Sequence, residues 1–279
     1  MSDKAFLSSA EIAEYAISTA QVKASSSVGK LLALGFIAGS FVAFASNGST
    51  MVAFNLLFQP DTYGLGKLIC GAIFPAALMM VLVAGGELFT GNTIMVMGLL
   101  EKKITLSAML RNWLIVYIGN FLGSLMVAAF VVYSGILHAG ADGFGGMTIR
   151  IAVSKTGSSF SQAVVLGILC NVLVCAAVWM SYGAKDVTGK LLSCFFVIWL
   201  FAASGYEHCV ANMFYIPAGI WASANPAWLE AAKMGGATAG LTWSGFLMRN
   251  LLPVTLGNII GGSGLIGGIY WFSYVHTKG

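Results

Sequence analysis

Long apolar segments alternate with short polar ones along the whole chain after residue 29. An unbroken transmembrane helix needs about 20 apolar residues, and six segments reach or approach that length. They cover residues 30–46, 67–100, 108–133, 161–182, 190–221 and 246–274. The second and fifth are longer than one crossing requires and are interrupted, at 85–92 and at 204–208. The pattern therefore predicts six spans, of which the second and fifth are each two half-helices joined by a loop.

The first 28 residues follow a different pattern. Ser8 and Glu11 have the spacing of a capping box at a helix start, and the apolar residues after them recur on one helical face. These apolar residues are Ile12, Ala13, Ala16, Ile17 and Ala20. We therefore expect residues 1–28 to form a cytoplasmic amphipathic helix that lies on the membrane or against a neighbouring subunit. Residues 29–279 would form the six-span channel domain.

Composition places the chain among membrane proteins. Hydrophobic residues make up 58% and charged residues 9% of it, whereas soluble domains carry roughly 25% charged residues. The basic residues stand singly at the ends of apolar runs, which is not a pattern for binding nucleic acid. The five cysteines lie within apolar runs and lack metal-ligand spacing, so no metal or cofactor is expected. These features predict an all-α protein embedded in a lipid bilayer.

The basic residues also predict the orientation. An even number of spans puts both termini on one side, which collects nine basic residues against five on the other. The nine are Lys4, Lys23, Lys30, Lys102, Lys103, Arg111, Lys185, Lys190 and Lys278, and the five are Lys67, Arg150, Lys155, Lys233 and Arg249. Because basic loops stay in the cytoplasm, we expect both termini on the cytoplasmic side of the cell's inner membrane.

The two halves of the chain repeat. In the third and sixth spans an Arg-Asn pair is followed eight residues later by a Gly-Asn pair. The pairs are Arg111-Asn112 with Gly119-Asn120, and Arg249-Asn250 with Gly257-Asn258. The first and fourth spans match more loosely, through Leu-Gly at 34–35 and at 166–167. Because three spans per half is an odd number, the halves must insert in opposite orientations. This predicts an inverted 3+3 repeat with its site near the bilayer midplane.

Glycines spaced four residues apart occur in the first, third and sixth spans. The pairs are Gly35/Gly39, Gly119/Gly123 and Gly257/Gly261. Small residues at this spacing let membrane helices approach closely, so we expect helix crossings at these positions.

The two interrupted segments contain the same unusual set of polar residues. Each places a carboxylate, Glu87 or Glu207, near a glycine and an asparagine five residues later. An ionisable residue inside the hydrocarbon is costly and normally faces a pore or a partner, and an interrupted helix frees backbone groups that can bind solutes. His208, the only histidine at membrane depth, lies in the second break and can donate a hydrogen bond or a proton near neutral pH. The breaks therefore indicate a transport path.

Three motifs give the chain a resemblance to the formate/nitrite transporter family. They are Gly86-Glu87-Leu88-Phe89-Thr90, Ala203-Ser204-Gly205-Tyr206-Glu207-His208 with Ala211-Asn212-Met213, and Pro253-Val254-Thr255-Leu256-Gly257-Asn258-Ile259-Ile260-Gly261-Gly262. The resemblance implies a homopentamer of six-span protomers, aquaporin-like in outline, each with its own pore. It also implies small monovalent anions as cargo, namely formate, nitrite and hydrosulfide.

By the same resemblance, five polar residues would line the pore. Lys155 matches the family's vestibule lysine, Asn171 its pore asparagine, Thr90 its mobile-loop threonine, His208 its central histidine and Asn258 a pore-side asparagine. On the residues alone, Lys155 is equally compatible with an anchor at the membrane surface. Asn171 is equally compatible with a hydrogen bond between helices, and His208 with a packed core position.

Five further residues complete the expected site. Phe74, Leu78 and Phe201 match the family's apolar constrictions, although their sequence context alone favours contact with lipid or core. Glu87 and Glu207 would repel an anion in the path. We therefore expect these carboxylates to support the broken helices by accepting hydrogen bonds from freed backbone amides.

These observations favour a channel or proton-coupled carrier for a small monovalent anion, and not an enzyme. The anion would cross either as a neutral acid after taking a proton near His208, or as a charged species that His208 only hydrogen-bonds. A dedicated hydrosulfide channel is the main alternative, since Glu87 and Gly91-Asn92 depart from the Asp-containing loop associated with formate channels. A neutral-solute, aquaporin-like pore would need a second Asn-Pro-Ala box beside the one at 225–227. An intramembrane enzyme would need a nucleophile–base pair or metal ligands.

Overall fold

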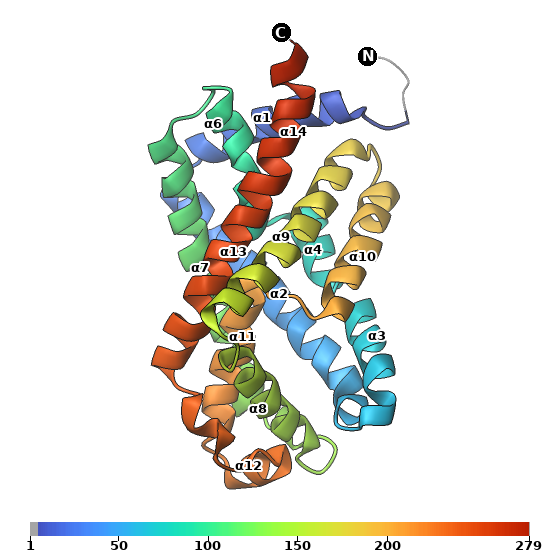
Figure 1. The fold of residues 1–279 in the computed structure, drawn as a ribbon, viewed down its shortest axis with the longest axis vertical. Helices are drawn as coiled ribbons and strands as arrows, with labels where there is room; N and C mark the ends of the chain where they lie inside the picture. The colour runs from blue at the N-terminus through green and yellow to red at the C-terminus, as the bar shows by residue number, and fades with distance from the viewer. Residues whose placement is uncertain (1–4, 279) are drawn as a thin grey trace.

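The computed structural model describes residues 5–278, which form a bundle of helices with no β-strand in that range (Figure 1). The first and last labelled helices, α1 and α14, lie at the same end of the bundle (Figure 1). Residues 1–4, and with them Lys4 of the orientation argument, lie outside the described residues, as does Gly279.

The helices of the first half are α1 (Ser9–Ser25), α2 (Val28–Leu57), α3 (Tyr63–Ile73), α4 (Ala76–Met80), α5 (Phe89–Asn92), α6 (Val96–Leu100) and α7 (Leu106–Tyr133). Those of the second half are α8 (Gly143–Thr156), α9 (Phe160–Gly183), α10 (Val187–Ser204), α11 (Cys209–Ala222), α12 (Pro226–Ala232), α13 (Leu252–Ile259) and α14 (Ile269–Tyr274). Wider π-helical turns extend α4 over Val81–Gly85 and join the last span over Gly245–Leu251 and Ile260–Gly268. Short 3-10 turns cover Pro60–Thr62, Thr93–Met95, Ile136–His138, Gly235–Gly240 and His276–Lys278.

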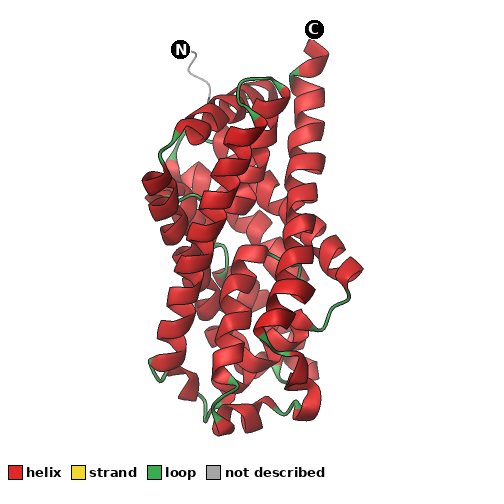
Figure 2. Ribbon diagram, turned by 90° about the vertical axis from the view of Figure 1, so that its left-hand side faces the viewer, coloured by secondary structure: helices red, strands yellow, loops and turns green. Residues whose placement is uncertain are grey.

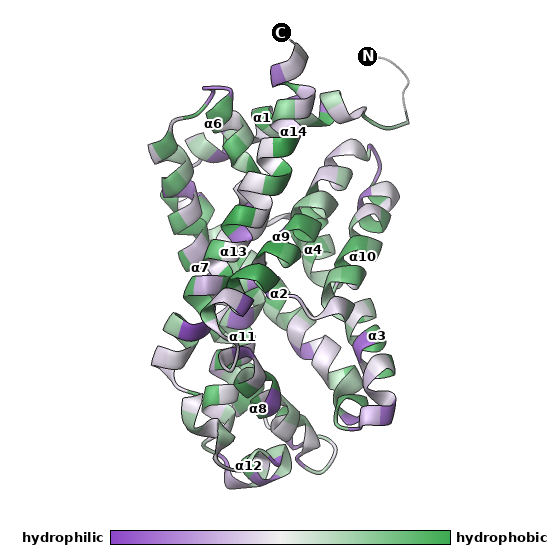
Figure 3. Ribbon diagram, in the orientation of Figure 1, coloured by the Kyte–Doolittle hydropathy of each residue, from purple (hydrophilic) through white to green (hydrophobic). Residues whose placement is uncertain are grey.

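The predicted number of spans is confirmed. Six helical segments are long and apolar enough to cross a membrane: Val28–Leu57, Pro60–Gly85, Leu106–Tyr133, Phe160–Gly183, Val187–Ser204 and Gly245–Tyr274. Hydrophobic residues dominate the middle of the bundle (Figure 3). The breaks in the second and fifth spans are also confirmed, because the shorter apolar helices Phe89–Leu100 and Cys209–Ala222 continue beyond them. Loop segments accordingly lie within the height of the bundle as well as at its ends (Figure 2).

The first span is longer than predicted. Its polar residues after position 45 resemble the end of a helix, yet α2 continues to Leu57. Their hydroxyls bond within the helix instead: Ser46 donates to the Val42 carbonyl, and Ser49 and Thr50 donate to the Ser46 carbonyl. Because these side chains are buried and satisfied locally, they do not end the helix.

The N-terminal helix begins at the predicted capping box, with the Ser8 side chain accepting from the Glu11 amide. All five predicted apolar residues of α1 are buried. They do not face lipid or another subunit as expected, because α1 packs on α6, α7, α9 and α14 of its own chain. Its apolar face therefore belongs to the core of the protomer.

Helix α8 was not predicted and is the structural counterpart of α1. It lies at the end of the bundle away from the termini (Figure 1) and packs against α11 and α12. The equivalence is visible in the spacing, since Lys23 of α1 precedes Gly35 by the same interval at which Lys155 of α8 precedes Gly167. Each repeat therefore includes a short helix before its three spans.

Each repeat contains one close helix crossing, and both crossings use predicted glycines. A Cβ atom at Gly39 or Gly123 would collide with the backbone at the crossing of α2 and α7. A Cβ atom at Gly257 or Gly261 would likewise collide with the backbone of α9 where α13 and the last span cross it. The two crossings are equivalent in the inverted repeat, and they bring the broken spans together in the middle of the molecule.

Candidate functional site

The two broken spans meet at a contact between His208 and Thr90. The preceding half-helices end at glycines with positive φ, Gly85 (95°) and Gly205 (79°), a conformation that glycine adopts at little cost. His208 then caps α11, with its Nδ1 accepting the Ala211 amide at 3.1 Å. Its Nε2 lies 2.8 Å from the Thr90 hydroxyl. Residues 118 positions apart in sequence thus form one buried polar pair.

The cap determines which tautomer the neutral ring adopts. Because Nδ1 accepts a backbone N–H, it carries no proton, so the proton of the neutral imidazole is on Nε2. Nε2 therefore donates to Thr90, whose hydroxyl hydrogen remains available for another acceptor. Adding a second proton at Nδ1 would require the cap bond to break.

An aromatic pair lies beside this junction. The rings of Phe74 and Phe201 meet edge to face with centroids 5.5 Å apart, and the Phe201 ring is 6.0 Å from the His208 ring. Leu78, the third predicted constriction residue, is also buried, but it does not line the cavity described next. The structure thus brings Phe74 and Phe201 together with His208 at the candidate site, and the role of Leu78 as a constriction residue stays a prediction.

A cavity of about 390 Å³ reaches the junction. Phe74, Phe201 and His208 are in its wall, together with residues of α3, α8 and α11. Its charged lining residues are Lys67, Arg150, Lys155 and Glu207. We call this cavity the vestibule. Its lining residues from α8, and Met234 beyond α12, place it on the side of the molecule away from the termini (Figure 1).

Lys155 is part of a closed polar network and not an isolated cation. Its Nζ lies 2.9 Å from Glu207 Oε1, and both side chains are mostly buried. Asn212 donates to the other carboxylate oxygen at 2.6 Å and to Asn250 at 2.7 Å, and Asn250 donates to the Lys155 carbonyl at 2.8 Å. The network ties α8 to the second break and to the last span.

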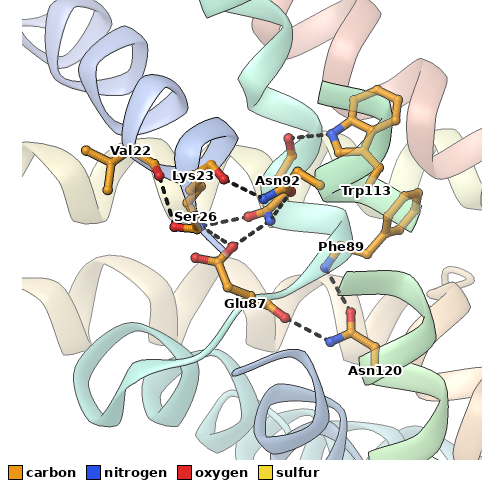
Figure 4. Close-up of polar contacts among 9 residues, drawn as sticks. Val22, Lys23, Ser26, Glu87, Phe89, Asn92, Trp113 and Asn120 are labelled. Atoms are coloured by element: carbon orange, nitrogen blue, oxygen red, sulfur yellow. Dashed lines mark hydrogen bonds and ion pairs between the residues drawn. The ribbon is translucent and has the colours of Figure 1, made fainter. Parts of the chain in front are cut away.

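The first repeat contains the equivalent network around Lys23, Glu87 and Asn92 (Figure 4). Lys23 Nζ lies 2.8 Å from both Glu87 and the Asn92 amide oxygen. Asn92 donates to Glu87 at 2.6 Å and to Asn112 at 2.9 Å, and Asn112 donates to the Lys23 carbonyl at 3.2 Å. Sequence reasoning missed Lys23, although its equal spacing to the glycine of the next span was a detectable signal.

Asn120 and Asn258 hold the freed backbone groups of the breaks. Asn258 accepts from the Cys209 amide at 2.9 Å and donates to the carbonyls of Gly167 and Glu207. Asn120 accepts from the Phe89 amide at 2.9 Å and donates to the carbonyls of Gly35 and Glu87 (Figure 4).

This arrangement differs from the prediction for the two glutamates. The amides at the half-helix starts bind these asparagines, whereas the carboxylates of Glu87 and Glu207 bind lysine and asparagine side chains. The two glutamates therefore connect to the broken helices through side chains. Asn258 is fully buried and bonded at both its amide atoms, so it stands behind the junction and not in the vestibule wall.

Asn171 anchors the loop that carries Thr90. Its amide nitrogen contacts the Asn258 carbonyl at 2.6 Å, the Thr93 hydroxyl at 3.1 Å and the Thr90 carbonyl at 3.3 Å. Its buried Oδ1 has no partner within the described part of the chain. Asn171 therefore lies beside the segment that carries Thr90, with its donors directed to the protein, and its contact with a passing anion stays a prediction.

Comparison with known proteins agrees with this geometry. The family model described as formate/nitrite transporter matches residues 10–272. The chain belongs to the formate/nitrite transporter family. The resemblance of the three motifs is therefore confirmed over almost the whole chain.

Relatives within the formate/nitrite transporter family are transporters and channels, not enzymes. A probable formate transporter of Methanothermobacter thermautotrophicus is 37% identical, with 97% of this chain and 98% of the relative covered. The formate channel FocA of Haemophilus influenzae is 41% identical, with 94% and 92% covered.

Two solved structures also align with the chain. A pentameric formate channel with formate bound has a TM-score of 0.76 at 32% identity and covers 89% of this chain and 98% of its own. An ion channel of the same family has a TM-score of 0.72 at 29% identity, with 94% and 97% covered. The six-span fold with two broken helices is thus that of the family's channels.

Proposed function

We propose that this member of the formate/nitrite transporter family is a homopentameric channel for small monovalent anions, with formate as the first candidate. Relatives named as formate transporters and channels, and a pentameric formate channel of the same fold, support the proposal. Each protomer would have its own pore. Both termini would lie on the cytoplasmic side of the inner membrane, as the basic residues indicate.

The observation that carries the proposal is the buried contact between His208 and Thr90 beside the pair of aromatic rings. A bare charge between Phe74 and Phe201 would lose most of its hydration, which is prohibitive for a divalent ion and costly for a monovalent one. A donor on each side of the junction replaces part of that hydration. A small anion with one or two acceptor atoms suits such a pair.

We infer that His208 acts from its neutral form. Its Nε2–H would be shared between Thr90 and the passing anion, while Nδ1 keeps the cap of α11. The imidazole would then donate a hydrogen bond without becoming a cation, and the direction of net flow would follow the solute gradient. The competing proton-coupled mechanism requires His208 to take up a second proton at Nδ1 first, which breaks the cap bond. The imidazolium could then give its Nε2 proton to the anion and return to the neutral form with its proton on Nδ1.

Anion flux into proteoliposomes tests the function. We expect formate, and to a lesser degree nitrite and hydrosulfide, to enter faster than into protein-free liposomes, whereas sulfate and potassium stay at background. Flux of hydrosulfide with formate at background would replace the formate proposal by a dedicated hydrosulfide channel. Water flux without any anion flux, or sulfate flux equal to that of formate, would contradict the anion-channel proposal itself.

A further inference from the structure

The vestibule contains three cations, and two of them have partners. Lys155 is paired with Glu207 at 2.9 Å, so the charges of the two largely cancel for an approaching ion. Arg150 donates to the Ala232 carbonyl at 3.3 Å, and its guanidinium lies over the Phe58 ring at 5.0 Å. These contacts fix both residues in the wall.

Lys67 of α3 is different. No hydrogen bond or ion pair to its ammonium is found in residues 5–278, yet it lines the same vestibule. It is within electrostatic range of both Lys155 and Glu207. Once the lysine–glutamate pair is counted as neutral, Lys67 and Arg150 are the vestibule cations whose charge no described carboxylate balances. Of these two, only Lys67 also lacks a hydrogen-bond acceptor in residues 5–278.

The ammonium of Lys67 lies near Gly205. A Cβ atom at Gly205 would lie 3.3 Å from Lys67 Nζ, so the ammonium lies close to the backbone where α10 ends. The C-terminal end of a helix carries partial negative charge that attracts a cation. A lysine at a membrane boundary normally extends its ammonium to the aqueous interface. Lys67 instead lines the vestibule beside Gly205 and Glu207.

We propose that Lys67, and not Lys155, supplies the unpaired ammonium that draws anions into the vestibule. The inference rests on the proposed function. An unpaired cation in a narrow, partly apolar cavity raises the local concentration of anions and their rate of entry. Lys155 would instead position Glu207 and the second break.

Transport kinetics provide the first test. Lys67→Met should raise the KM for formate about three- to tenfold at low ionic strength and leave the maximal rate nearly unchanged, since the junction is intact. Lys67→Arg should retain the wild-type KM. The difference should shrink as an impermeant salt is added, because salt screens an exposed charge. Lys103→Met, an exposed lysine outside the vestibule, should behave as wild type.

A second measurement does not depend on transport. Cys70 lines the vestibule, whereas the other four cysteines are buried. The ratio of its modification rates by a sulfonate-bearing and an ammonium-bearing methanethiosulfonate reports the local potential, because the thiolate fraction cancels in the ratio. Lys67→Met should lower this ratio roughly tenfold, and Cys70→Ser should abolish labelling. Ser154→Cys on the Cys70→Ser background gives an independent reporter in the same cavity.

The two measurements separate the possible failures. If the wild type carries no anion but the labelling ratio falls in Lys67→Met, the proposed function is wrong and the electrostatic role of Lys67 stands. If KM and the labelling ratio at both reporters are unchanged in Lys67→Met, Lys67 is a helix anchor and the inference is overturned. A KM rise that is independent of salt and is shared by Lys67→Arg would also overturn it, because it would indicate altered packing.

Discussion

At the scale of single residues, His208 combines a structural and a chemical task. One ring nitrogen caps a half-helix and the other donates to Thr90. A histidine that begins a helix in this way is held in orientation by the helix itself, and no carboxylate is required. Glu207, although adjacent in sequence, bonds to Lys155 and the neighbouring asparagines instead.

Replacing His208 distinguishes hydrogen bonding from titration. Asparagine is a good helix cap and has no group that titrates between pH 5 and 8. His208→Asn should fold and assemble, but its shorter side chain cannot both cap α11 and reach Thr90, so we expect formate flux to fall about tenfold or more. The pH profile of the remaining flux between pH 5 and 7 should keep its wild-type shape. A flattened profile would instead show that His208 titrates during transport. His276→Asn, at the exposed C-terminal end, is the matched control.

At the scale of elements, each broken span is held by one asparagine from a neighbouring span. Asn120 of α7 and Asn258 of α13 each bind one amide and one carbonyl of a break, and each also binds one carbonyl of a neighbouring continuous helix. Without water in the hydrocarbon region, such backbone groups must be satisfied by the protein. The asparagines therefore stabilise the interruptions, and the interruptions in turn place Thr90 and His208.

Replacing either asparagine, Asn120 or Asn258, should destabilise the fold to a similar degree. Asn120→Ala and Asn258→Ala each leave buried backbone groups unpaired, at a cost of about 1–3 kcal/mol per group. We expect both variants to melt several degrees below the wild type in detergent, as followed by loss of the oligomer peak on size-exclusion chromatography after heating. Asn55→Ala, at an exposed position of α2, should melt with the wild type. If Asn258→Ala also melts with the wild type, the hydrogen bonds of Asn258 contribute little to stability.

The sequence predicted the elements that follow a repeated pattern. It did not predict the features that depend on tertiary contacts, such as the end of α2. The lengths of the apolar runs and the equal spacing of Arg-Asn and Gly-Asn pairs are local signals, and they predicted the spans and the inverted repeat. The end of α2 was misplaced because Ser46, Ser49 and Thr50 satisfy their hydroxyls inside the helix. The Lys23–Glu87 pair joins residues 64 positions apart. Only a comparison of the two halves, in which Lys23 and Lys155 precede a glycine by the same interval, could have indicated it.

At the scale of the whole molecule, the predicted glycine faces are used within the protomer. They form the crossings of α2 with α7 and of α9 with α13, and α1 is likewise packed on its own chain. Contacts between protomers must therefore come from the exposed apolar faces. Large examples are Leu114 and Phe130 of α7 and Phe196 of α10.

Native mass spectrometry in mild detergent tests the assembly. We expect a species of five chains, each of 29.2 kDa, because the fold matches that of a pentameric channel. The same species should persist in His208→Asn, which changes no exposed face. A monomer or trimer as the dominant species of the wild type would contradict the pentamer.

The order of the lysine–glutamate pairs along the chain bears on how the protein is made. In each half the lysine comes first, Lys23 before Glu87 and Lys155 before Glu207. During synthesis, the cation is therefore already outside the ribosome when the carboxylate segment enters the membrane. An unpaired carboxylate in hydrocarbon would be costly, and this order provides each one with a waiting partner. A chain that lacks α1 would lose this provision in its first half only, and its insertion would fail at the segment that carries Glu87.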